Sequence, residues 1–303
     1  IIYKSKLIFI NVFRIIEIMD QNTLSDTIHF DGIGLHTGLK VNLELRPAKE
    51  NSGITFYRKD LNKKIKANWK NVMSTKFSTN LGTNNCSVKT VEHLLSAFAG
   101  LHISNCDVIV DNEEIPIMDG SSKLFVDEIL KVGIKNQNIK QKAIEIKKKV
   151  RFDCDYGFGE LLPNAQNEEG LNIFLQSSFD GKYEDQTINI ENLNGGYPSK
   201  ISHARTFGFF NEIEYLKSQN LIKGGSLDNA IVIKDLKPIN PEGLRYENEL
   251  MRHKVLDVVG DLYLSGLPII GKYNGFKTGH YITYNLLKEL FKNENNYKII
   301  NSN

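Results

Sequence analysis

Residues 250–264 read LMRHKVLDVVGDLYL, a stretch with the length of a helix of about four turns. Most of its positions are apolar, and a helix that is apolar around most of its circumference is buried inside a protein. The remaining polar residues fall on one stripe, which consists of His253, Lys254, Asp257, Gly260 and Asp261. Because unpaired buried charge is costly, this stripe must face other polar groups or an enclosed wet cavity. We expect the rest of the chain to be organised around this helix.

His253 and Asp257 are four residues apart, so their side chains lie one above the other and can bind one metal ion. The alternative is a buried His–Asp hydrogen bond that only satisfies the protein core. The pair by itself favours this alternative. The further acid and the lysine on the same stripe bring the two interpretations close to balance.

The overall composition is that of an ordinary globular protein. The chain has 303 residues, 41% of them apolar and 24% charged, and its length favours two domains. A net charge of +2 gives no reason to expect nucleic acid or a membrane surface as partner. The three cysteines are widely separated and odd in number, which argues against a disulfide framework or a cysteine zinc site. We therefore expect a reducing compartment, the cytoplasm. Any metal would have to be held by histidine and carboxylate.

Residues 1–18 are apolar, and Met19 stands just before the first organised segment. The uncharged run 7–13 is broken by Arg14 and is followed by no small-residue cleavage site, so it does not resemble a signal peptide. It is also too short to span a bilayer. We interpret Met19 as the true start and residues 1–18 as a dispensable extension, and we expect a soluble protein without an integral membrane segment.

In the first half, the periodicity predicts a helix over residues 87–99 that is ended by Gly100. Glu92 and His93 lie off its apolar stripe, so we expect them on a solvated face. A second helix is predicted over residues 123–132. The polar stretch that follows it predicts a domain boundary near residue 140.

Strands and further helices are predicted from alternation and helical periodicity along the rest of the chain. Strands are predicted at residues 27–30, 41–45, 54–58, 106–111, 143–152, 171–176, 230–233 and 267–273. Helices are predicted at residues 211–220 and 286–292, and a polar surface loop at residues 59–70.

Seven segments resemble one family when they are taken together and in order. They are GIGLHTG (32–38), TVEHLLSAFAG (90–100), EIPIMDGSS (114–122), SHARTFGF (202–209), IEYLKSQNLIKGGSLDNAIV (213–232), RHKVLDVVGDLYL (252–264) and KTGH (277–280). Each motif by itself is weak. The series resembles UDP-3-O-acyl-N-acetylglucosamine deacetylase, the zinc amidase of lipid A biosynthesis in Gram-negative bacteria, from about Met19 to about residue 291.

The resemblance implies one Zn²⁺ per chain, held by His93, His253 and Asp257. Such a His₂–carboxylate set leaves a fourth position open, which is typical of a catalytic zinc. The same ligands also accept Fe²⁺ or Co²⁺.

The resemblance also implies the acid–base residues. Glu92 would take a proton from the attacking water, and His280 would act as general acid toward the leaving amine or as a cation near the oxyanion. Asp261 would orient His280 and raise its pKa. Thr206 would stabilise the oxyanion. Lys254 would contact the sugar or diphosphate.

Phe207 and Phe209 would stack on the uracil, or they would pack only against neighbouring residues. The implied substrate is a small molecule, an acylated UDP-sugar, and the family suggests a monomer. The implied reaction removes the N-acetyl group and gives UDP-3-O-acyl-glucosamine and acetate, the committed step of the pathway.

The implied fold is α+β: two similar two-layer domains of helices packed on sheets, with the active site between them. The first would cover residues 19–140 and the second 141–298. Each would carry a small insert, at 58–72 and at about 207–237, and the second insert would line a passage for the acyl chain. Four apolar residues would line this passage or pack the insert's own small core, namely Ile213, Leu216, Leu221 and Ile222.

Two other functions fit part of the pattern. One is a zinc amidase that acts on another acylated amine. The other is a non-catalytic protein that binds acylated nucleotide sugars, which would be expected to have lost Glu92 or His280, although both are present.

Overall fold

The computed structural model describes residues 20–301, apart from residues 84, 167 and 194–195. The extension predicted for residues 1–18 lies outside the described residues. Within the described part of the chain, no helix is long and apolar enough to cross a membrane.

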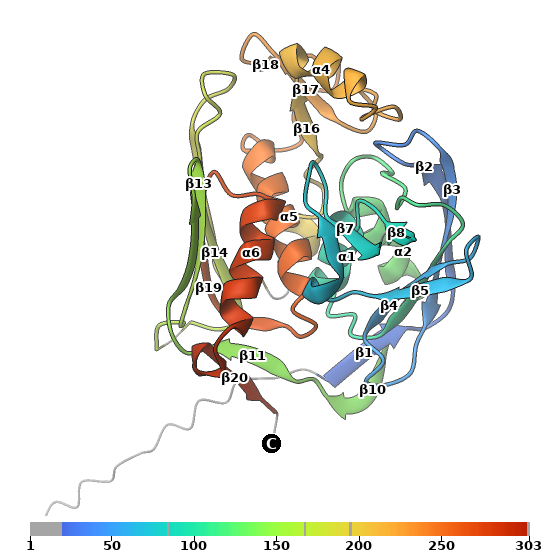
Figure 1. Cartoon of the computed structure of the whole chain (residues 1–303), viewed down its shortest axis with the longest axis vertical. Helices are drawn as coiled ribbons and strands as arrows, with labels where there is room; N and C mark the ends of the chain where they lie inside the picture. The colour runs from blue at the N-terminus through green and yellow to red at the C-terminus, as the bar shows by residue number, and fades with distance from the viewer. Residues whose placement is uncertain (1–19, 84, 167, 194–195, 302–303) are drawn as a thin grey trace, which may run out of the picture.

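The first half folds into a five-stranded sheet covered by two helices (Figure 1). Neighbouring strands are antiparallel except β4 and β9, which run parallel. Helices α1 (Glu92–Gly100) and α2 (Lys123–Val132) supply apolar side chains to the core. The strand order is β2 (Ile28–Ile33), β3 (Lys40–Pro47), β9 (Cys106–Val110), β4 (Ile54–Arg58) and β5 (Lys63–Lys66).

The second half folds into a seven-stranded sheet on the other side of the molecule (Figure 1). Helix α6 (His280–Phe291) packs against β12 and β13 of this sheet. Five strands of the sheet follow one another in the order β12 (Val150–Cys154), β13 (Gly157–Leu162), β19 (Ile269–Phe276), β11 (Ala143–Ile146) and β20 (Tyr297–Ile300). Strand β14 (Leu171–Ser177) pairs in parallel with β19, and β15 (Gln186–Ile190) pairs with β14.

Three smaller sheets complete the described structure. They are β1 (Asp20–Leu24) with β10 (Ile134–Lys140); β6 (Val72–Ser74) with β7 (Asn80–Thr83) and β8 (Cys86–Val88); and β16 (Phe207–Phe209) with β17 (Ile231–Lys234) and β18 (Lys237–Pro238). The last of these forms a lobe together with α4 (Ile213–Ser218), at the top of Figure 1. The short helix α3 (Tyr197–Lys200) and three 3₁₀ turns, η1 (Trp69–Asn71), η2 (Phe210–Glu212) and η3 (Glu294–Asn296), connect the other elements.

Helix α5 (Glu249–Tyr263) lies in the middle of the molecule and packs against α1 on one side and α6 on the other. Its apolar residues are buried, as are His253 and Asp261 on its polar stripe. The predicted buried helix and the predicted α+β class are therefore confirmed. The domain boundary near residue 140 stays a prediction; Lys140 is the last residue of β10, and β11 begins at Ala143.

The predicted start of α1 was wrong. Residues 86–88 form strand β8, which pairs with β7, so the helix begins only at Glu92. Gly100 is the last helical residue and not a stop beyond the helix. A glycine is required there because a Cβ atom would lie 2.2 Å from the ring of Tyr197.

The expectation that Glu92 and His93 are exposed was also wrong, because they are only 3% and 5% exposed. The polar face of α1 is covered by α5, which lies about 160 residues further along the chain. No local pattern can reveal this covering.

Three further expectations differ from the structure. The single strand predicted at 143–152 is two strands, β11 and β12. Helix α6 begins at His280 and not at Leu286. The polar stretches at 59–70 and 133–142 contain β5 and β10, whose residues are mostly exposed, so they lack the apolar alternation that predicts a strand.

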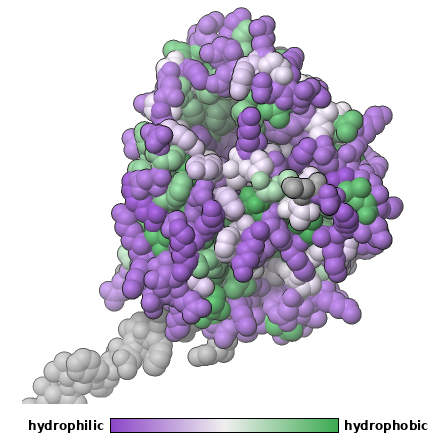
Figure 2. All heavy atoms as spheres, in the orientation of Figure 1, coloured by the Kyte–Doolittle hydropathy of each residue, from purple (hydrophilic) through white to green (hydrophobic). Residues whose placement is uncertain are grey.

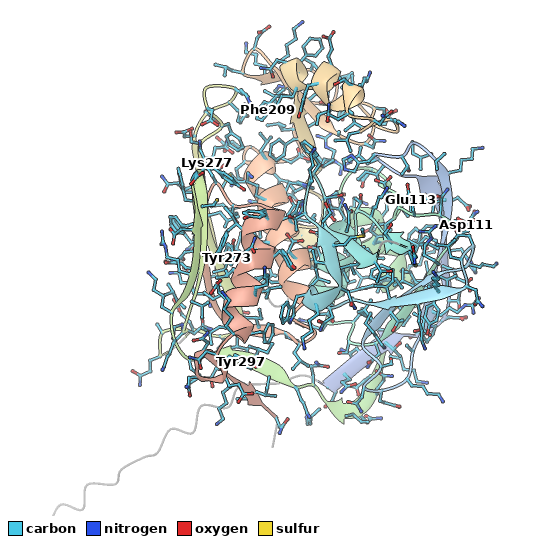
Figure 3. All side chains as sticks on the ribbon, in the orientation of Figure 1. Asp111, Glu113, Phe209, Tyr273, Lys277 and Tyr297 are labelled. Carbon is cyan, nitrogen blue, oxygen red and sulfur yellow. The ribbon has the colours of Figure 1, made fainter. Side chains whose placement is uncertain are left out.

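The surface seen in Figure 2 is mostly hydrophilic, and hydrophobic side chains gather below the upper lobe, where the surface is hollowed. In Figure 3, Phe209 and Lys277 lie at the end of the molecule that carries this lobe, whereas Tyr297 lies at the opposite end. The polar stripe of α5 extends toward the lobe end, because His253 is near the first turn of this helix.

Candidate active site

The packing of α1 against α5 brings three metal-ligating side chains together. Ligand atoms of His93, His253 and Asp257 all lie within 4.8 Å of one another. Oδ1 of Asp257 is 3.4 Å from Nε2 of His253 and 3.8 Å from Nε2 of His93. Two atoms that each bind a tetrahedral zinc at about 2.1 Å are about 3.4 Å apart. The spacing of the three ligand atoms therefore fits one such ion.

The protonation states of this cluster also fit a metal. Burial, aided by the neighbouring His253, lowers the pKa of His93 to about 3, so its imidazole is neutral. Burial acts to raise the pKa of Asp257, but three nearby histidines outweigh it and lower that pKa, so the carboxylate is ionised. Oδ1 of Asp257 is buried and has no hydrogen-bond partner among the described residues. A cation would satisfy this oxygen, since buried charge needs a partner.

The second nitrogen of His253 is also held in place. Nδ1 lies 3.0 Å from the carbonyl oxygen of Ala204. A carbonyl can only accept a hydrogen bond, so the proton is on Nδ1 and the lone pair of Nε2 faces the cluster.

Glu92 begins α1 directly beside the ligand His93. Its Oε2 accepts a hydrogen bond from the backbone N–H of Thr79 at 3.0 Å, and its Oε1 lies 3.6 Å from Nε2 of His280. Burial raises the pKa of Glu92 to about 8, although the charge of His280 opposes this. A cation held at the adjacent cluster would lower this pKa again.

His280 is the first residue of α6, and its Nδ1 lies 2.8 Å from Oδ2 of Asp261. Burial acts to lower the pKa of this imidazolium. The charges of Asp261 and Glu92 outweigh burial and raise the pKa to about 10. His280 is therefore a cation whose Nε2–H is free to donate toward Glu92 or toward a substrate.

Two further predicted residues, Thr206 and Lys254, are close in the chain to groups of this centre. Thr206 follows the Ala204 carbonyl by two residues, and its own backbone bonds to Gly120 and Ile231 at 2.7 and 2.8 Å. The ammonium of Lys254 donates to the carbonyl of Thr278 at 3.0 Å, and burial lowers its pKa.

The two predicted aromatic residues belong to one cluster around Phe179. The ring centroid of Phe207 lies 6.2 Å from that of His253, next to the metal ligands. Phe209 contacts Phe179 and Phe207, at centroid distances of 6.2 and 6.1 Å, and among the described residues no ring contact joins it to His93 or His253. The structure thus brings Phe207 to the site and leaves Phe209 one layer away.

The sequence interpretation missed Thr79, which bonds to two of the three acids of the site, Glu92 and Asp261. Its backbone N–H binds Glu92, and its hydroxyl donates to Oδ1 of Asp261 at 2.6 Å. Nothing in its polar, loop-like surroundings points to this role. Arg205 was also missed as a site residue, although an arginine close to the aromatic residues of the SHARTFGF motif was a usable signal.

A buried His₂Asp cluster, with a carboxylate and an imidazolium beside it, is the arrangement of a metal-site hydrolase. The chain matches the family model described as UDP-3-O-acyl N-acetylglycosamine deacetylase over residues 21–292. It therefore belongs to this deacetylase family.

Curated relatives in three bacteria carry the name UDP-3-O-acyl-N-acetylglucosamine deacetylase. The protein of Teredinibacter turnerae is 45% identical over 283 residues, covering 92% of this chain and 93% of the relative. The protein of Saccharophagus degradans is 44% identical, and the match covers 92% of this chain and 93% of the relative. The protein of Vibrio parahaemolyticus is 42% identical, and the match covers 90% of each chain.

Proposed function

We propose that this protein is a zinc-dependent hydrolase that removes the N-acetyl group of UDP-3-O-acyl-N-acetylglucosamine and releases acetate, in the biosynthesis of lipid A. The observation that carries the proposal is the placement of Glu92 and His280 beside the His93–His253–Asp257 cluster. The names of the relatives support the choice of substrate.

His93, His253 and Asp257 would hold the metal. A zinc ion bound there would supply Lewis acidity and make water nucleophilic near neutral pH. The set also accepts Fe²⁺, and one metal per chain is proposed because the three residues form one cluster.

Glu92 would accept the proton of the attacking water, since it is ionised once a cation lies beside it. His280, kept protonated by Asp261, would donate a proton to the leaving amine or stabilise the oxyanion by its charge. Thr79 would help by holding Glu92 and Asp261 at fixed positions. The Thr206 hydroxyl would donate to the developing oxyanion.

Lys254 would contact the anionic part of the substrate, and Phe207 and Phe209 would contact the uracil or the sugar. The lobe formed by α4 and β16–β18 would hold the acyl chain. Ile213, Leu216, Leu221 and Ile222 are only partly buried, which supports their proposed role in lining that passage. We further propose a cytoplasmic monomer.

The proposal is tested by acetate release from UDP-3-O-acyl-N-acetylglucosamine. The chain from Met19 is stripped of metal, given one equivalent of zinc, and compared with Glu92→Gln and with the control Glu113→Gln on the surface. We expect zinc to restore release, Glu92→Gln to lower it by about 10²–10⁴-fold while zinc still binds, and the control to match the parent. No release from folded, zinc-loaded protein would favour another acylated amine or a binding function.

A further inference from the structure

One peptide group, between Ala204 and Arg205, is bonded at both ends by residues of α5. Its N–H donates to Oε1 of Glu249 at 3.0 Å, and its carbonyl accepts from Nδ1 of His253 at 3.0 Å. Glu249 and His253 are four residues apart, one turn of the helix. Because a trans peptide is planar and rigid, fixing its N–H also fixes the direction of its carbonyl.

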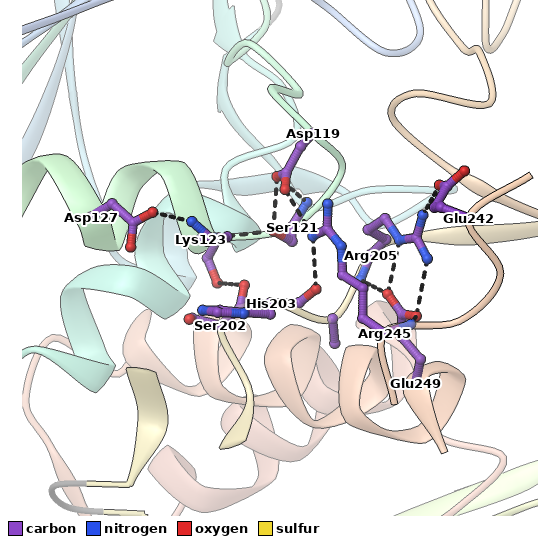
Figure 4. Close-up of polar contacts among 12 residues, drawn as sticks. Asp119, Ser121, Lys123, Asp127, Ser202, His203, Arg205, Glu242, Arg245 and Glu249 are labelled. Atoms are coloured by element: carbon purple, nitrogen blue, oxygen red, sulfur yellow. Dashed lines mark hydrogen bonds and ion pairs between the residues drawn. The ribbon is translucent and has the colours of Figure 1, made fainter. Parts of the chain in front are cut away.

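Glu249 is in turn held by the Arg205 side chain. Nε and Nη2 of Arg205 reach the Glu249 carboxylate at 2.9 and 3.2 Å, and Nη2 also donates to the carbonyl of Gly243 at 2.7 Å (Figure 4). Glu242 accepts from Nη1. Arg205 is 1% exposed and Glu249 is fully buried.

A second network secures the same backbone segment from its other side (Figure 4). Nη1 of Arg245 donates to Oδ2 of Asp119 at 2.8 Å and to the carbonyl of His203 at 3.0 Å. The loop that carries Asp119 continues to Gly120, whose carbonyl accepts from the N–H of Thr206. Residues 203–206 are therefore held at successive peptide groups.

Stability alone does not account for such an ion pair. Removing two charges from water is costly, and apolar residues of similar volume are often as stabilising as a buried ion pair. Apolar residues cannot, however, set the direction of a peptide group. The directional hydrogen bonds of Arg205 and Glu249 do so, and they act on the peptide that orients a metal ligand.

We propose that the Arg205–Glu249 ion pair is a positioning device for the metal centre. It holds the Ala204 carbonyl so that His253 keeps its proton on Nδ1 and presents Nε2 to the metal. The same segment carries Thr206, so the pair also positions the oxyanion-binding hydroxyl. This inference rests on the metal site of the proposed function but not on the identity of the substrate.

Partners of metal-binding histidines typically change metal affinity by about 10–100-fold. We expect Glu249→Gln, which keeps the shape but removes the charge, to weaken zinc binding by about this factor. Arg205→Lys should have a smaller effect in the same direction, because lysine supplies a single charged group in place of the planar fork. Arg58→Gln is the matched control. Arg58 is also buried and paired through two nitrogens, with Asp60 at 2.9 and 2.6 Å, and it contacts none of the three ligands.

The experiment measures zinc affinity by competition with a chelator on folded protein, and acetate release in parallel. The expected result is weaker zinc binding in Glu249→Gln and unchanged binding in Arg58→Gln. If Glu249→Gln does not fold, Arg205→Lys is measured, together with the NMR signal of the His253 Nδ1–H, which should exchange faster with water. Zinc affinity within threefold of the parent and an unchanged Nδ1–H signal would overturn the inference. Weakened zinc binding in Glu249→Gln, together with a zinc-loaded parent that releases no acetate, would instead contradict only the proposed function.

Discussion

A Cβ atom on Gly260 of α5 would lie 2.1 Å from the carbonyl oxygen of Glu92 on α1. The two helices therefore touch backbone to backbone at this point. The contact places Glu92 and His93 against the stripe that carries His253, Asp257 and Asp261. The proposed active site depends on this close approach, because α1 and α5 together carry the proposed metal ligands and the proposed base.

Gly260→Ala should separate the two helices. Overpacking costs about 1–3 kcal/mol, which exceeds the gain of about 1 kcal/mol that alanine has over glycine in a helix. We expect a lower urea midpoint and a lower kcat/KM, measured on purified variants. Gly208→Ala is the control for the urea midpoint, because a Cβ there meets no atom within 4 Å. Equal midpoints for Gly260→Ala and the parent would show that the helices can adjust without cost.

Asp261→Asn should change the pH dependence of the reaction. Burial opposes the protonated form of His280, and the charge of Asp261 is the largest influence that raises its pKa to about 10. Without that charge the pKa of His280 falls. Since His280 must be protonated to act as an acid, activity should be lost at a lower pH on the alkaline side. Profiles of kcat/KM between about pH 6 and 10 test this, with the partly buried Asp127→Asn, on α2, as control. An unshifted alkaline limb would argue against His280 as the acid.

The same raised pKa affects the stability of the metal-free protein. A group whose pKa is higher in the folded than in the unfolded state increases the free energy of unfolding when it is protonated. This increase is fully present at pH values below the unfolded pKa, which is about 6.5 for histidine. This contribution should disappear as the pH rises toward about 10 in the parent. In Asp261→Asn the contribution of His280 to the free energy of unfolding should be lost at a lower pH. Urea unfolding between about pH 6 and 10 measures this.

Removal of the metal should lower thermal stability as well as activity. A ligand that binds only the folded state stabilises it by about 4 kcal/mol when present at about 1,000 times its Kd. Zinc should therefore raise Tm in the parent, with an effect that grows with concentration, and His93→Ala should lose most of this response. The exposed His29→Ala should keep it. A normal zinc response in His93→Ala would place the metal elsewhere.

Thr206→Val should lower kcat by about 10²-fold, as the loss of one oxyanion donor does in other hydrolases, without changing zinc affinity. Valine keeps the shape of threonine and leaves the backbone bonds to Gly120 and Ile231 intact. Acetate release at saturating substrate and chelator competition measure the two quantities. Thr187→Val, on the surface strand β15, is the control. An unchanged kcat would assign Thr206 a purely structural role.

Much of the fold was accessible from local patterns. Both ends of α2 were predicted, because its apolar residues recur with the helical period and Gly133 follows it. Both ends of β4 were predicted as well, because it is a short run of β-branched and aromatic residues that follows Gly53. Strands β5 and β10 were missed because their exposed residues do not alternate. The start of α1 was missed because the tertiary pairing of β8 with β7 overrides local helical periodicity.

The sequence by itself determined that α5 is a buried helix with a polar stripe, since 15 residues of strong periodicity suffice for that conclusion. It also placed His253 and Asp257 on one face. Only the tertiary structure decided that His93 and Glu92 are buried against that face, that Thr79 bonds to Glu92 and Asp261, and that the Ala204–Arg205 peptide bonds to His253. The pKa values of Glu92 and His280 were decided at the same level. The physical reason is that burial and the charges around a group depend on segments far apart in the chain, whereas periodicity depends only on neighbours.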